Sequence, residues 1–156
     1  MAVRDCYINQ HNPIWSGLYL DKNQLYTVDR YGCIVCCAAM CICHRFGITH
    51  DNGDETNPGK KQIIEAVIAN CCDSNGDFYY NAYIEFDPEI YGNNNSFLWT
   101  RTDETPDMYG WPIVYYKGHP HAVLFTDPWT VLDPANEAIT TASQADARYT
   151  GPKSYW

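Results

Sequence analysis

Cys33 is the residue best placed in this sequence to act as a nucleophile. It follows Tyr31-Gly32 and opens the run CIVCCAAMCIC, which carries no charge and predicts a buried helix. The N-terminus of a helix stabilises a thiolate through its unpaired N–H groups and its macrodipole. Gly32 would let the chain turn sharply and leave the sulfur accessible. Cys33 could also be one more core cysteine, and its position alone leaves both interpretations open.

A thiol nucleophile needs a base, and the segment GHPHAVLF at 118–125 offers two histidines. His121 leads directly into an apolar strand, from which it could face a helix N-terminus as the imidazole of a thiolate–imidazolium pair. His119 is the competing candidate. Pro120 cannot donate to a sheet ladder and biases His119 toward an extended loop. We therefore expect His121 to be the base and His119 to be solvated.

Two further residues could complete such a site. Asp133, in VLDPAN, ends the strand that follows the histidine strand, so it could hold the imidazole in one tautomer from a neighbouring strand. The alternative is that Asp133 only begins an Asp-Pro turn. The side-chain amide of Gln10 could stabilise an oxyanion together with the backbone N–H of the nucleophile.

The elements that must position these residues follow from hydrophobic periodicity. A buried helix is predicted over 33–46, because His44 and Arg45 in its last turn and Gly47 beyond it are stop signals. An amphipathic helix is predicted over 58–72, with Pro58 at its first position. The sequence DSNG at 73–76 predicts a turn. Strands are then expected in FYYNAYIEF, SFLWTR, WPIVYY, HAVLFT and WTVLD, with Asp127-Pro128 as a hairpin turn between the last two.

Helices followed by strands predict an α+β fold with an antiparallel sheet. The length of 156 residues fits one domain over 1–156. We expect an ordered N-terminal arm over 1–30, a helical part over 33–72 and an antiparallel sheet over 78–135.

Taken together, these segments resemble the C39-like family of papain-type cysteine peptidases. The resemblance lies in Gln10 of YINQHNPIWS, Cys33 of DRYGCIVCCAAM, His121 of GHPHAVLF and Asp133 of VLDP, and it covers roughly residues 7–135. It implies a papain-like fold, a buried N-terminal helix packed on an antiparallel sheet, and a site made of these residues. Chains with this arm are common among phage and bacterial proteins, and bacteriocin-processing relatives cut leader peptides.

The function implied is that of a thiol-dependent hydrolase, a cysteine peptidase that cleaves a peptide amide bond. In this reading Cys33 attacks, His121 moves the proton, Asp133 orients the ring and Gln10 binds the oxyanion. The substrate would be a peptide or protein, including a peptide of peptidoglycan. The alternative is a papain-like domain without catalysis, used as a structural or binding protein in a phage particle or against a host factor.

Charge and composition indicate which classes of partner are not expected. A formal net charge of −9 disfavours binding to phosphate backbones, so no nucleic acid is expected as a partner. The sequence has no long apolar run and its first residues lack the apolar core of an export signal, so neither a membrane partner nor export is expected. We expect a reducing cytoplasmic location, or a virion or host cytoplasm for a phage-encoded chain; the oligomeric state is not predicted.

The eight cysteines are expected to be mostly small buried hydrophobes in a reduced protein. Neighbouring cysteines and cysteines of one helix mostly lack the geometry for disulfides. A zinc site made from Cys33, Cys36, His44, Cys71 and Cys72 is disfavoured, because structural zinc pairs usually lie on turns. A calcium loop over 73–85 is disfavoured as well, because its glycine and its last residue do not fit the ligand pattern. No metal and no cofactor are expected.

Overall fold

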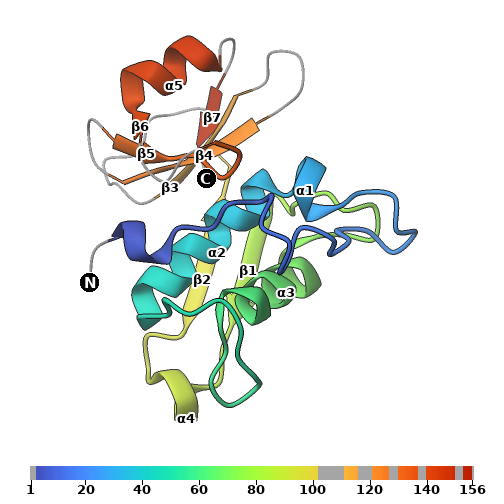
Figure 1. Ribbon diagram of the computed structural model, residues 1–156. Coiled ribbons are helices and arrows are strands. Elements are labelled where there is room, and N and C mark those ends of the chain that lie inside the picture. Colours follow the sequence, from blue (N-terminus) through green and yellow to red (C-terminus); the bar gives the residue numbers. More distant parts are fainter. Residues whose placement is uncertain are drawn as a thin grey trace.

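The computed structural model describes residues 3–101, 111–115, 121–126, 130–136, 140–149 and 153–155 (Figure 1). The helices are η1 (Val3–Cys6, a 3-10 helix), α1 (Val28–Tyr31), α2 (Cys33–Phe46), α3 (Lys60–Cys71), α4 (Pro88–Tyr91) and α5 (Ala142–Arg148). The strands are β1 (Asn81–Glu85), β2 (Ser96–Thr100), β3 (Trp111–Tyr115), β4 (His121–Phe125), β5 (Thr130–Leu132), β6 (Thr140–Thr141) and β7 (Lys153–Tyr155). The fold is mixed helix and antiparallel sheet, and the predicted α+β class is confirmed.

The central helix α2 has the bounds that the uncharged run predicts. Most of its residues are buried, its first residue Cys33 is partly exposed, and His44 and Arg45 in its last turn are exposed. Gly47 ends the helix in the left-handed region, with φ of 72°, and its N–H bonds to the Cys43 carbonyl. Cations in the last turn and a left-handed glycine after it stabilise a helix C-terminus.

The helix α3 begins later than predicted, at Lys60, so the expectation that Pro58 is its first residue is wrong. The N–H groups of Lys60 and Lys61 bond to the carbonyls of His50 and Asp51, which holds the preceding chain extended. Gly59 lies so close to this backbone that a Cβ atom there would come within 2.8 Å of the Asp51 carbonyl oxygen. These contacts with the preceding chain act together with a local bond, from the Gly59 N–H to Gln62 Oε1, to set the helix start.

The strands form two sheets rather than the single sheet that was predicted over 78–135. The strands β1 and β2 pair with each other, and the second sheet has the order β6-β5-β4-β3-β7. One face of the smaller sheet is buried, through Ala82 and Ile84 of β1 and Phe97 and Trp99 of β2. The strand β1 packs on α3, so the smaller sheet covers the helical part of the molecule. The candidate site residues His121 and Asp133 belong to the larger sheet, His121 as the first residue of β4 and Asp133 directly after β5. The predicted hairpin turn at Asp127-Pro128 lies outside the described residues.

The helix α2 packs on α3 and also on β3 and β4, so it lies between α3 and the larger sheet (Figure 1). The N-terminal segment adds Ile8 and Trp15 to the core, both almost fully buried. The buried Lys60 ammonium donates to the Tyr7 carbonyl oxygen at 2.9 Å and ties this segment to α3. Within the part of the chain that the structure describes, no helix has the length and apolar character needed to cross a membrane.

Candidate active site

Cys33 is the first residue of α2, and it is partly exposed. The preceding Gly32 ends α1 and caps α2, with φ of −86° and ψ of 14°. Other residues adopt this conformation readily, so the prediction that Gly32 is needed for a sharp turn is wrong. Glycine is needed for a different reason, the lack of space for a side chain. A Cβ atom at Gly32 would lie 2.7 Å from the Val28 backbone, closer than real contacts allow. Gly32 therefore lets α1 pack tightly against the start of α2 and fixes where Cys33 lies.

Gln10 is tied to both sides of the site. Its side-chain Nε2 donates to the Asp29 carbonyl oxygen at 2.9 Å, and its backbone N–H donates to the Pro134 carbonyl oxygen at 2.8 Å. In an uninterrupted helix, the Asp29 carbonyl would accept the N–H of Cys33. The Gln10 amide occupies this carbonyl where α1 breaks into α2. The side chain of Gln10 is therefore anchored to the last turn before α2, and one of its two amide protons is left for another acceptor.

His121 is the first residue of β4, and its ring connects a carboxylate with the thiol. Its Nε2 lies 2.8 Å from Asp133 Oδ1, and its side chain is only 14% exposed. Burial alone would lower the pKa of His121, but hydrogen bonds with the Asp133 and Cys33 side chains outweigh burial and raise the pKa to about 9. Because Asp133 occupies Nε2, the ring nitrogen left for Cys33 is Nδ1. The raised pKa therefore favours the protonated imidazole of His121 near neutral pH.

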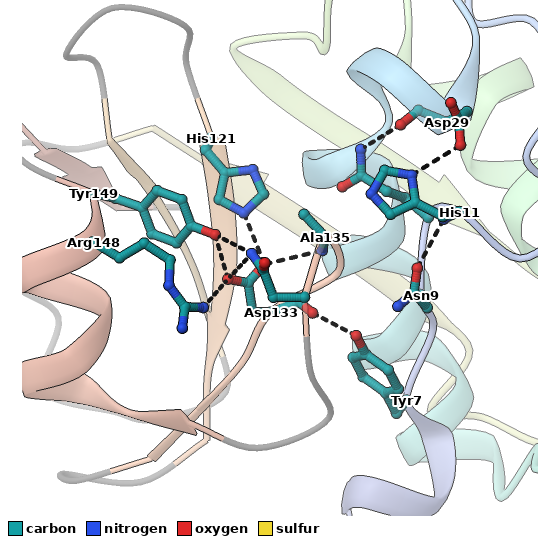
Figure 2. Close-up of polar contacts among 11 residues, drawn as sticks. Tyr7, Asn9, His11, Asp29, His121, Asp133, Ala135, Arg148 and Tyr149 are labelled. Carbon is teal, nitrogen blue, oxygen red and sulfur yellow. Dashed lines mark hydrogen bonds and ion pairs between the residues drawn. The ribbon is translucent and has the colours of Figure 1, made fainter.

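Asp133 directly follows β5, and its carboxylate is fully buried. The oxygen Oδ1 accepts from His121 and from the backbone N–H of Ala135, while Oδ2 faces Asn136, Arg148 and Tyr149 (Figure 2). Burial raises the pKa of Asp133, but the hydrogen bonds from His121 and Tyr149 more than offset it and lower the pKa to about 2. A buried carboxylate with this many donors stays ionised.

The raised pKa of His121 predicts how stability depends on pH. The folded protein holds this proton up to about pH 9, whereas an unfolded histidine loses it near pH 6.5. The pair's contribution to stability is therefore complete below about pH 6.5 and is lost as the pH rises through 9. The Tm of the wild-type protein should fall more steeply between pH 6 and pH 9.5 than the Tm of His121→Ala. Equal slopes in differential scanning fluorimetry would contradict the charged pair.

The neighbouring cysteines differ from Cys33 in their environment. Cys36 and Cys37 are fully buried in α2, and burial raises the pKa of both thiols well above the ordinary value. Burial also raises the pKa of Cys41 to about 12. All eight cysteines are free thiols in the structure. Cys33 is therefore the only cysteine of α2 described both next to an imidazole and at the helix N-terminus.

The structure brings Cys33, His121 and Asp133 into one connected group and attaches Gln10 to both sides of it. The competing histidine, His119, lies outside the described residues. The contribution of Arg148, the last residue of α5, and of Tyr149, which follows it, was not predicted from the sequence. A signal was present, since Thr141 and Gln144 form a capping box that marks a helix start.

The residues considered for a zinc site and for a calcium loop have other roles in the structure. The turn at 73–76 is confirmed, because the Gly76 N–H bonds to the Asp73 carbonyl and the Asp73 carboxylate accepts the N–H groups of Asn75 and Asp77. Among the residues that the structure describes, no group of three or more His, Cys, Asp or Glu side chains is arranged to hold a metal ion. The arrangement around Cys33 instead suits proton transfer and nucleophilic attack.

Comparison with known proteins adds no relative: no protein-family model, no curated protein and no solved structure matches the chain.

Proposed function

We propose that this protein is a thiol-dependent hydrolase with a papain-like arrangement, and that it cleaves a peptide amide bond. The observation that carries the proposal is the 2.8 Å contact between His121 Nε2 and the buried Asp133 carboxylate, on a ring whose pKa the Cys33 side chain also helps to raise. A thiol at a helix N-terminus, a charged imidazole and an orienting carboxylate are the parts that an activated sulfur nucleophile needs.

The reaction follows from these positions. The Cys33 sulfur attacks the amide carbonyl carbon, and the carbonyl oxygen becomes an oxyanion that the Cys33 N–H and the free amide proton of Gln10 stabilise. The C–N bond breaks as the His121 imidazolium gives its proton to the leaving amine, which yields a thioester on Cys33. Neutral His121 then takes a proton from water, the hydroxyl attacks the thioester, and the thiolate leaves with a carboxylic acid as the second product.

The substrate class proposed is a peptide, either within a protein or in a peptidoglycan stem or bridge. A digest of a mixed peptide pool and of purified peptidoglycan, compared between the wild-type protein and Cys33→Ser by mass spectrometry, tests for hydrolysis. New termini that appear only with the wild-type protein are the expected result. Their absence from every pool, with Cys33 unreactive, would favour a domain that binds without catalysis.

Brief treatment with iodoacetamide at neutral pH should label Cys33 before any other cysteine. Cys36 and Cys37, deeper in the same helix, provide the internal control, because they are buried and their thiols have raised pKa values. Peptide mapping after quenching measures the order of labelling. Preferential labelling of Cys6, with Cys33 inert, would count against the proposed nucleophile.

A further inference from the structure

Tyr149 lies at the end of α5 and contacts two members of the candidate site. Its hydroxyl donates to Asp133 Oδ2 at 2.5 Å, and its ring centroid lies 4.3 Å from that of His121 (Figure 2). The Asn136 side-chain amide donates both to Asp133 Oδ2 and to the Tyr149 hydroxyl oxygen, which closes a small network. We propose that Tyr149 is a positioning residue, whose hydroxyl locks the Asp133 carboxylate in the orientation that presents Oδ1 to His121.

A carboxylate can rotate about its Cβ–Cγ bond, so being buried does not by itself fix which oxygen faces the imidazole. The contacts of Asp133 divide the two oxygens clearly. The Ala135 N–H and His121 meet Oδ1, whereas Asn136, Arg148 and Tyr149 meet Oδ2. Of these last two, Arg148 is the longer contact, at 3.4 Å, and its side chain is 39% exposed. The Tyr149 hydroxyl, at 2.5 Å, is therefore the shortest contact of Oδ2, ahead of the Asn136 amide at 3.0 Å.

The tyrosine can act as a donor over the whole working pH range. Burial, the hydrogen bond to Asp133 and the negative charge of Asp133 raise the pKa of the Tyr149 hydroxyl, so it keeps its proton. Its own placement is fixed by α5, since the Tyr149 N–H bonds to the Ala145 carbonyl at 2.8 Å and Ala145 is fully buried. The helix starts at Thr141 with a capping box and packs on β5, the strand that leads into Asp133.

The test removes only the hydroxyl. Tyr149→Phe keeps the ring beside His121 and should slow iodoacetamide labelling of Cys33 by about tenfold, because a small misplacement of a base is costly in rate. It should also weaken the downfield NMR resonance of the His121 Nε2–H, which depends on the bond to Asp133. Tyr83→Phe is the matched control, since Tyr83 is half exposed on β1 and its hydroxyl bonds to Glu85. The control should change neither readout.

This inference rests on the proposed function. The labelling rate and the NMR resonance distinguish a failure of the inference from a failure of the proposed function. If wild-type Cys33 proves unreactive, the proposed function fails, and the resonance alone then decides the role of Tyr149. An unchanged resonance in Tyr149→Phe would overturn the positioning role of Tyr149, whether or not Cys33 is reactive. A measurement on the wild-type protein covers the case in which the variant does not fold. The Tyr149 hydroxyl proton should exchange slowly with water, and rapid exchange would contradict a hydroxyl held by Asp133.

Discussion

Replacing His121 by alanine is expected to slow the labelling of Cys33, and any hydrolysis, by about 100-fold or more, while the protein stays folded. In the proposed mechanism the imidazole supplies both the positive charge beside the sulfur and the proton for the leaving group, and general acid–base catalysis of this kind contributes roughly 10²–10⁴-fold. The buried Asp133 carboxylate keeps its donors Ala135, Asn136, Arg148 and Tyr149 in this variant, which supports a folded protein. Rates of iodoacetamide labelling and circular dichroism spectra measure the two parts of this expectation.

His119→Ala is the matched control for this experiment. It removes the neighbouring imidazole, and Pro120 separates it from the strand that begins at His121. Its labelling rate should stay within about twofold of the wild-type rate, since a catalytic base must be held rigidly and Pro120 biases His119 toward an extended loop. If His119→Ala lost labelling and His121→Ala retained it, the base would be His119, and the proposed role of Asp133 would fall as well.

Replacing Asp133 by alanine is expected to destabilise the protein by about 3–5 kcal/mol, the cost of removing one partner of a buried ion pair. The carboxylate is fully buried and accepts from His121, Ala135, Asn136, Arg148 and Tyr149, all of which would lose their acceptor. Chemical denaturation with urea measures the free energy of unfolding. In the wild-type protein, the contribution of Asp133 should be complete above about pH 4 and be lost as the pH falls through about 2.

Asp29→Ala gives a matched control for the loss of Asp133. The pair His11–Asp29 has the same separation, 2.8 Å, as the pair His121–Asp133, but its side chains are 50% and 47% exposed. Surface pairs of this kind contribute roughly 0.2–1 kcal/mol, so Asp29→Ala should cost less than about 1 kcal/mol. Similar losses in the free energy of unfolding for Asp29→Ala and Asp133→Ala would show that burial does not strengthen the pair His121–Asp133.

The parts of the fold that were predictable from the sequence depend on local signals. The helix α2 was predicted with its bounds because an uncharged run ends in cations and glycine. The strands β1 to β5 lie within the predicted segments, because their apolar and aromatic residues show strand patterns. The division into two sheets was not predictable, because pairing depends on contacts between distant segments. The start of α3 was missed for the same reason, since the backbone near His50 fixes it.

The candidate site shows the same division. Cys33, His121 and Asp133 were named because each stands beside a recognisable element, a helix start, a strand start and a strand end. Gln10 was named only through resemblance, and its contact with the Asp29 carbonyl could not be read from the sequence. Tyr149 was missed because a tyrosine after a short helix has no signature of its own. Its importance appears only when β6 and α5 fold against β5.

The placement of Cys33 early in the chain has a consequence for biosynthesis. Translation at about 5–20 residues per second makes α2 several seconds before the ribosome reaches β4, β5 and α5. During this interval the nascent thiol has no imidazole, no carboxylate and no tyrosine to complete it. The activation proposed for the Cys33 sulfur can therefore begin only after the long-range strand pairs of the larger sheet have formed, so an unfinished polypeptide would not carry it.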